Sequence, residues 1–220
     1  MADEINPDWF LPVAVSFVKV LERPENAAIV GKSDGLIWNG VYGYSETNVA
    51  IYGKGLGPQG HAGFFEGLVG IKGNLVVSGD IALSNGDCAE DFDISCVDKV
   101  EPGTVMVLGN EGALFESQQA YDKRVAGVIS GAGDYKPAIV LDKKETTGNR
   151  QPIALMGKVF CKVDAQFGEI EVGDLLTTSS TPGHAMKADD PMKAFGAVIG
   201  KALRPMKDGK GMIPILIALQ

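Results

Sequence analysis

Short apolar stretches that end in a glycine recur through residues 27–84 of this chain. Three of these glycines, Gly67, Gly73 and Gly79, stand six residues apart. Glycine permits the tight turns that end a strand, so each unit predicts a very short strand followed by a turn. A strand of this length cannot bury an apolar face by itself. The repeat therefore requires neighbours, either further coils of a solenoid or the same segment of other chains.

The number of units favours other chains. There are only about six irregular units, and a solenoid of that size in one chain would be thin and uncapped. We therefore predict that residues 27–84 form a short β-stalk, β-helix-like and intertwined, in which three chains wind around a common axis. The strands of residues 69–83 would then bury four apolar side chains at the trimer interface, those of Val69, Ile71, Val77 and Ile81.

The composition supports many short strands and little helix. Glycine accounts for 29 of the 220 residues, nearly twice the usual ~7%. It follows no strict three-residue period, which excludes a collagen helix. The best helical candidate, residues 8–21, alternates apolar side chains as a strand does. We expect an all-β protein, in which residues 1–26 form an N-terminal attachment segment.

The C-terminal half carries an internal duplication. Residues 100–107 resemble residues 170–177, and residues 125–130 resemble residues 195–200, both at an offset of 70. The turn between them also matches, at Gly112 and Gly183, one residue out of step. Two copies of one strand unit predict a duplicated β-barrel or sandwich over residues 85–220. Further strands are expected at residues 137–141, 152–156 and 212–219.

Charge and cysteine usage exclude several classes of partner. The net charge of −8 repels phosphate backbones, so no nucleic-acid partner is expected. No apolar run approaches the roughly 18–20 residues of a membrane span, and the acidic N-terminus has no signal-peptide pattern. The odd set of Cys88, Cys96 and Cys161 has no metal-ligand spacing, which favours buried or half-buried free thiols in a reducing compartment.

Two motifs resemble nucleotide-binding loops but fail in detail. Gly31-Lys32-Ser33 lacks the earlier glycine of a phosphate loop, since position 26 is Asn26. Residues 55–60 spell G-x-G-x-x-G, but Pro58 lies inside the motif and no helix start follows it. The two histidines, His61 and His184, lack the partners of a nucleophilic or zinc site. We therefore predict no cofactor and no metal.

Residues 85–93 form the segment richest in chemically reactive side chains. Four carboxylates within seven residues repel one another, so some of their pKa values should be raised. The first interpretation is an acidic, solvated connector between stalk and head. A Ca²⁺-type cation site is a second interpretation, although no known loop spacing fits. A carboxylate pair that acts on its own backbone is the third.

Three segments resemble phage tail-fibre and neck-appendage proteins. Residues 62–81 resemble their stalk-to-head sequence, and residues 86–90 (Gly-Asp-Cys-Ala-Glu) resemble the signature that opens an intramolecular-chaperone, self-cleaving domain. Residues 121–130 and 173–188 also fit this group. The resemblance implies a trimer whose C-terminal domains align three chains and register the stalk.

The resemblance also implies a cleavage site. In self-cleaving members the cut precedes the signature aspartate, which acts together with the glutamate three residues on. Carried over, the catalytic pair is Asp87 and Glu90, and the cut falls between Gly86 and Asp87. Cleaving relatives tend to have serine where Gly86 stands and tyrosine where Cys88 stands. We therefore expect a retained head domain, with self-cleavage as an alternative.

These observations predict a structural subunit of a homotrimeric phage-type tail fibre or spike, and not a metabolic enzyme. The N-terminal segment would attach to a tail or baseplate protein. The particle would be a virion or an extracellular injection system of contractile type, assembled in the cytoplasm. A further alternative is a module that binds a glycan or cell-surface receptor through the aromatic residues Trp38, Tyr42, Tyr44 and Tyr52.

Overall fold

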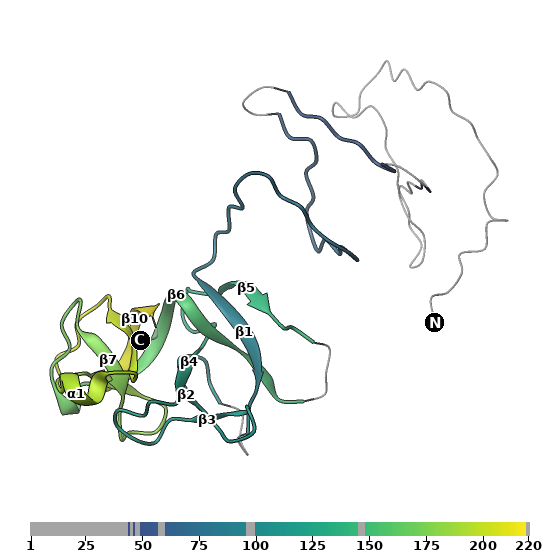
Figure 1. Cartoon of the computed structure of the whole chain (residues 1–220). Coiled ribbons are helices and arrows are strands. Elements are labelled where there is room, and N and C mark those ends of the chain that lie inside the picture. Colours follow the sequence, from purple (N-terminus) through teal and green to yellow (C-terminus); the bar gives the residue numbers. More distant parts are fainter. Residues whose placement is uncertain are drawn as a thin grey trace. The chain divides into compact units, whose positions relative to one another are not determined.

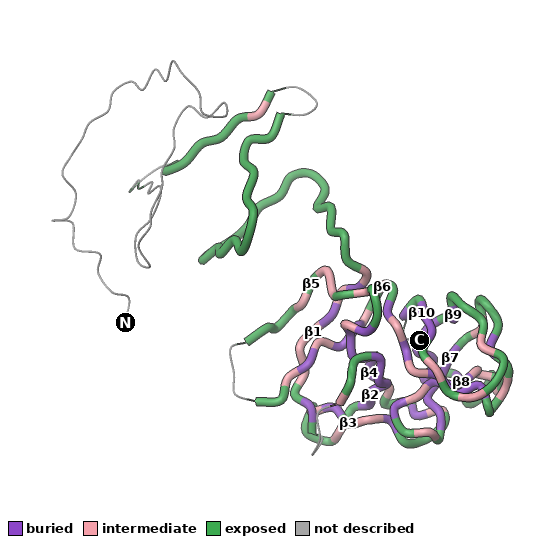
Figure 2. The backbone as a smooth tube through the Cα atoms, turned by 180° about the vertical axis from the view of Figure 1, so that it is seen from behind, coloured by how far each residue is buried: buried purple, intermediate pink, exposed green. Residues whose placement is uncertain are grey.

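The structure is a computed structural model that describes residues 44, 46, 49–56, 60–95, 100–144 and 148–218. Contacts divide the chain into two units, residues 1–75 and 76–220. The described residues before position 87 form no strand, and nearly all of them are exposed (Figure 2). In the described part of the chain, no helix has the length and apolar character to span a membrane.

The strands from residue 87 onward form the head (Figure 1). Its described residues contain a 10-stranded sheet and almost no helix. The helical elements are the one-turn η2 (Ala165–Phe167) and α1 (Pro191–Ala194). The strands are β1 (Asp87–Asp93), β2 (Val105–Leu108), β3 (Leu114–Glu116), β4 (Val125–Ile129), β5 (Pro137–Leu141), β6 (Arg150–Asp164), β7 (Leu175–Thr178), β8 (Ala185–Lys187), β9 (Val198–Ala202) and β10 (Lys210–Ala218).

The pairing closes two small barrels in tandem. In the first barrel, β1 pairs with the first half of β6, which pairs with β4, then β2, then β3. A parallel bridge between Ile94 and Leu114 returns to the chain just after β1 and closes the ring. In the second barrel the order is the second half of β6, β10, β9, β7 and β8. The parallel pair Val163 and Ala185 closes it in the same way.

The 15-residue strand β6 belongs to both barrels. Its residues 150–157 are the last strand of the first barrel, and its residues 158–164 are the first strand of the second. Asp87 at the start of β1 and Ile217 near the end of β10 both pair with Gly157, at the midpoint of β6. The chain therefore enters and leaves the head on either side of one residue. β5 lies outside the first ring and pairs in parallel with β1.

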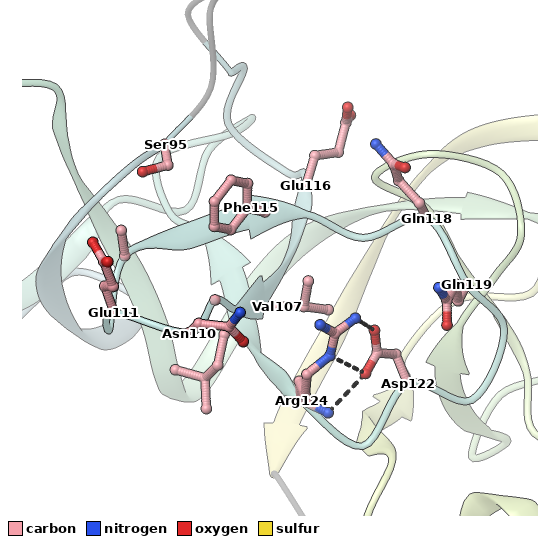
Figure 3. A pocket seen from close by; sticks show the side chains of 13 residues that line it. Ser95, Val107, Asn110, Glu111, Phe115, Glu116, Gln118, Gln119, Asp122 and Arg124 are labelled. Carbon is pink, nitrogen blue, oxygen red and sulfur yellow. Dashed lines mark hydrogen bonds and ion pairs between the residues drawn. The ribbon is translucent and has the colours of Figure 1, made fainter.

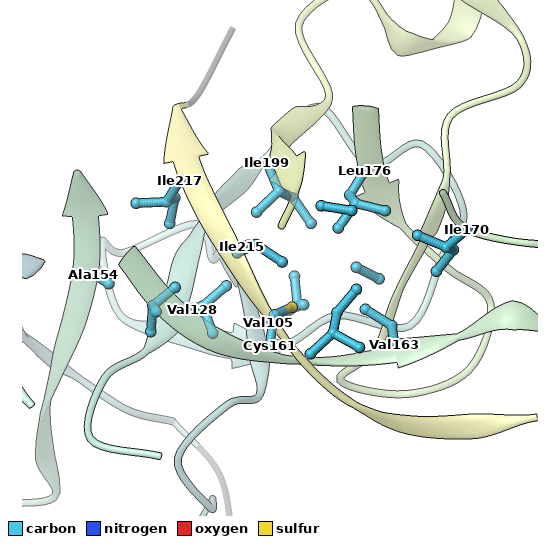
Figure 4. Packing of buried hydrophobic residues seen from close by; sticks show 14 of the residues in the cluster. Val105, Val128, Ala154, Cys161, Val163, Ile170, Leu176, Ile199, Ile215 and Ile217 are labelled. Carbon is cyan, nitrogen blue, oxygen red and sulfur yellow. The ribbon is translucent and has the colours of Figure 1, made fainter. Parts of the chain in front are cut away.

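The two barrels have equivalent cores. The first core consists of six buried residues, Ile94, Met106, Leu114, Ala126, Ile129 and Ile153. When the two barrels are aligned by their strand registers, these residues correspond to six buried residues of the second core. They are Val163, Leu176, Ala185, Ile199, Ala202 and Ile215, most of them labelled in Figure 4. Both copies also carry a register shift at the same point, after Met106 and after Leu176. The duplication therefore extends to each core position.

The outer face of the first barrel packs against the second. Val105, Val128 and Ala154 lie side by side in register on β2, β4 and β6, and all three are fully buried in the larger core cluster (Figure 4). The equivalent row of the second barrel begins with Leu175 and Lys201, which are exposed. A lysine in this row suits a surface that faces water.

The all-β fold and its barrel domain are confirmed, and so are the strands expected at residues 137–141 and 152–156 and near the C-terminus. The alignment of the last duplicated strand was wrong. Gly127 pairs with Met106 as Gly200 pairs with Leu176, an offset of 73 and not 70. The reason is that α1 lengthens the connection between β8 and β9. Segment 1–26 and residues 27–43 of the predicted stalk lie outside the described residues.

Candidate functional site

Hydrogen bonds fix the backbone where the chain enters the head. The Gly86 amide donates to the Lys136 carbonyl at 2.9 Å, and the Lys158 amide donates to the Gly86 carbonyl at 3.0 Å. A Cβ atom on residue 86 would lie 2.8 Å from the Lys158 carbonyl oxygen. The close approach of this backbone explains glycine at this position, because a serine side chain would collide with it.

Asp87 begins β1 with a buried carboxyl group. The residue is 3% exposed, and its Oδ2 accepts a hydrogen bond from Ser130 Oγ at 2.7 Å. No donor among the described residues reaches Oδ1. Burial raises the pKa of the Asp87 carboxyl, and the hydrogen bond from Ser130 offsets part of that rise. The interpretation of residues 85–93 as a solvated connector was wrong, because β1 is a paired strand of the first barrel.

The Asp87 carboxyl is hydrogen-bonded to Ser130, and its action together with Glu90 stays a prediction. Glu90 is half-buried and pairs in register with Leu141 and Ile153. Ser130 follows β4, 43 residues after Asp87. The spacing of residues in the sequence does not predict this partner, because the contact depends on how β1, β6 and β4 pair.

The remaining predicted site residues precede the head in the sequence. Val69, Ile71, Val77 and Ile81, the predicted trimer contacts, are all exposed in the single chain. Tyr44 and Tyr52 are exposed as well, whereas Trp38 and Tyr42 lie outside the described residues. Trimer contact and glycan binding both stay predictions.

A pocket of about 490 Å³ opens on the outer surface of β2 and β3 (Figure 3). Its lining combines Phe115 with carboxylates and amides, among them Glu111, Glu116 and Gln118. At one side the Arg124 guanidinium donates to both oxygens of Asp122, at 3.0 and 2.7 Å. These hydrogen bonds hold the pKa of Asp122 below its usual range. Sequence analysis missed this pocket, since its residues come from turns whose positions depend on the barrel.

Metal and thiol chemistry find little support. No group of three or more His, Cys, Asp or Glu residues is placed to hold a metal ion within the described ranges. Cys161 is fully buried in the second core, which raises its pKa to about 12. Cys88 is half-buried, and both are free thiols as predicted, while Cys96 lies outside the described residues.

Comparison with solved structures gives weak likenesses, three of which are described below. No protein-family model matches the chain, and no curated protein matches it. The C-terminal fragment of bacteriophage phi29 gene product 12 has a TM-score of 0.40 at 14% identity, over 60% of this chain and 100% of that fragment. Pre-mature phi29 gene product 12 has a TM-score of 0.43 at 14% identity, over 63% of this chain and 23% of that one. The N base of the phi29 head fiber gp8.5 has a TM-score of 0.31 at 20% identity, over 58% of this chain and 92% of that one.

Proposed function

We propose that the chain is a subunit of a homotrimeric phage-type tail fibre or spike, and that its head drives trimer assembly. The exposed apolar side chains ahead of the head carry this proposal. Between residues 49 and 83 the large apolar residues exposed in the single chain are Val49, Ile51, Tyr52, Leu56, Phe64, Phe65, Leu68, Val69, Ile71, Leu75, Val76, Val77, Ile81 and Leu83. A run of this kind requires a partner surface.

Three copies of the segment would supply that surface. Full burial of one Val, Leu, Ile or Phe side chain contributes about 1.5–3 kcal/mol, so each such contact between copies would stabilise the assembly. The described residues of the segment form no strand within one chain, and pairing between chains would satisfy their backbone groups. In this proposal the N-terminal segment attaches to a tail or baseplate protein of a virion or injection-system particle.

Native mass spectrometry of the full-length protein tests the proposal. A particle of three times 23.2 kDa that releases intact chains on denaturation supports it. A monomer that persists at micromolar concentration overturns it, because the apolar segment would then need no partner copies.

A second candidate function is self-cleavage between Gly86 and Asp87. The observation in its favour is the buried Asp87 carboxyl, whose raised pKa suits a general acid next to the peptide bond concerned. Incubation of purified protein should then yield fragments 1–86 and 87–220. Asp87→Asn should abolish this cleavage and Ser130→Ala should change its pH profile. An intact wild-type chain after prolonged incubation from pH 4 to 8 removes this candidate.

A further inference from the structure

The pocket of the first barrel has a covered counterpart on the second. By the strand registers, Leu108 of the first barrel is equivalent to Thr178 of the second, and Phe115 is equivalent to Met186. In the first barrel Leu108 and Phe115 are 43% and 44% exposed, whereas Thr178 and Met186 are buried. Phe115 is therefore open to solvent on the first barrel, whereas its equivalent Met186 is covered on the second.

A segment of the first barrel closes the surface of the second. The connection between β3 and β4 crosses β7: the Tyr121 amide donates to the Thr178 carbonyl at 3.1 Å, and the Asp122 amide donates to Thr178 Oγ1 at 2.7 Å. Tyr121 holds a φ of 58°, an uncommon value for a residue with a side chain. In this contact, the second barrel binds the connection between the third and fourth strands of the neighbouring barrel.

The second barrel has an equivalent connection between β8 and β9. It comprises residues 188–197 and includes α1. Its inner side contacts Tyr121, since the Asp190 amide donates to the Tyr121 hydroxyl at 3.1 Å. Its two large apolar side chains, Met192 and Phe195, are 87% and 83% exposed. These side chains are available to a further barrel.

We propose that the connection of residues 188–197 of a second copy of this chain docks in the pocket of the first barrel, with Phe195 against Phe115. The contact would be apolar, because Lys193, the one cation of the connection, is already paired with Asp190 at 3.2 Å. Each contact joins two different surfaces, and three copies related by a threefold axis would close a ring of heads. The inference rests on the proposed homo-oligomer and specifies which surfaces of the head meet.

Cross-linking of mixed variants tests the docking. In full-length protein with Cys88→Ser and Cys96→Ser, one preparation carries Phe115→Cys and another carries Phe195→Cys. After the two are co-expressed and treated with a short bismaleimide, the proposal expects a cross-linked dimer that contains one chain of each kind. Either variant alone should give no cross-link. A cross-link formed by Phe195→Cys alone, or none in the mixture, overturns the proposal.

A second measurement separates this inference from the proposed function. Phe195→Glu should weaken the oligomer roughly tenfold or more, as loss of a buried aromatic contact does. Val172→Glu changes another exposed apolar residue of the second barrel and should leave assembly unchanged. If the wild type is a trimer that Phe195→Glu leaves intact, the docking is wrong and the trimer stands. If the wild type is a monomer, both fail. Unchanged thermal unfolding of Phe195→Glu monomers excludes misfolding as the cause.

Discussion

Gly103 and Gly173 hold the same place in the two barrels, each with a φ of 92°. The Gly103 amide donates to the Ile129 carbonyl and the Gly173 amide to the Ala202 carbonyl, both at 2.8 Å. Each glycine is the third residue of a turn, closed by a hydrogen bond from the next amide to the carbonyl of Glu101 or Glu171. The turn that leads into β2 and the turn that leads into β7 therefore make the same hydrogen bonds.

Substitution of either glycine by alanine should destabilise the head. A side chain at this φ costs about 1–2 kcal/mol. A Cβ atom at position 103 would also lie 2.8 Å from the Met212 methyl group, whereas a Cβ atom at position 173 would have no neighbouring atom within 4 Å. The Met212 methyl is the end of a flexible side chain, so the two losses should differ by less than about 1 kcal/mol. Urea denaturation measures both. Gly173→Asn is the control and should cost less than Gly173→Ala, because asparagine tolerates this backbone conformation.

Asp87 should make the head less stable as the pH rises. Its pKa is raised in the folded protein, so the folded state binds more protons than the unfolded state. Its contribution is therefore fully present below the unfolded pKa of about 4 and declines as the pH increases through the raised folded value. Asp87→Asn keeps an acceptor for Ser130 and should flatten this part of the profile. Urea unfolding at a series of pH values from 3 to 8 gives the difference curve. A wild-type profile identical to that of Asp87→Asn contradicts the prediction.

Truncation of one second-core residue should be far more costly than truncation of its neighbour. Leu176 is fully buried, and Leu176→Ala should destabilise the head by about 2–5 kcal/mol. Leu175 stands next to it on the exposed face of β7, and Leu175→Ala should cost about 1 kcal/mol or less. Met106→Ala tests the equivalent position of the first core. Equal losses for Leu175→Ala and Leu176→Ala, measured by chemical denaturation, are incompatible with the described barrel.

Thr181 should protect the head against acid. Desolvation tends to raise the pKa of the buried Asp164, but hydrogen bonds from the Thr181 hydroxyl at 2.6 Å and the Gln166 amide at 3.0 Å, together with nearby positive charge, leave that pKa lowered. A lowered pKa contributes stability above about pH 4 that is lost as the pH falls through the folded value. Thr181→Val should cost about 1.5–3 kcal/mol at pH 7 and move acid unfolding to higher pH. Thr181→Ser keeps the hydroxyl group and should behave as the wild type does.

Ile71→Asp should prevent trimer formation and leave a monomer or an aggregate. The reason is that a charged carboxylate has no partner inside an apolar trimer interface. The neighbouring change Lys72→Asp alters charge on a side chain that an extended segment turns the other way, and it should leave the trimer intact. Size-exclusion chromatography with light scattering distinguishes the two. A soluble trimer of Ile71→Asp would contradict the intertwined stalk.

The sequence predicts the strands and the duplication well, because both depend on local patterns. Similar runs of small and apolar residues mark β4 and β9, and a glycine turn marks the start of β2 and β7. The alignment of Val125 with Phe195 was wrong, since small and apolar residues match in more than one register and α1 shifts the true partner to Val198.

The candidate sites were harder to predict because they depend on contacts between distant strands. The raised pKa in the acidic segment was predicted in direction, but burial and not repulsion between neighbours is its main cause. Asp87 was predicted as a site residue, whereas its hydrogen-bond partner Ser130 was not. The pocket beside Phe115 also escaped prediction, because only the folded barrel brings the turn at Glu111 next to Arg124.

The meeting of β1 and β10 at Gly157 has a mechanical consequence for the head. Tension applied between Gly86 and Ala218 acts at the two strand ends that flank this residue, across the direction of the strands and not along them. Such a load breaks the hydrogen bonds between strands one after another, beginning at the loaded end. A load along the strands would instead strain many of these hydrogen bonds at once. The head should therefore resist heat and denaturant through its two cores and yield readily to a pull on its ends.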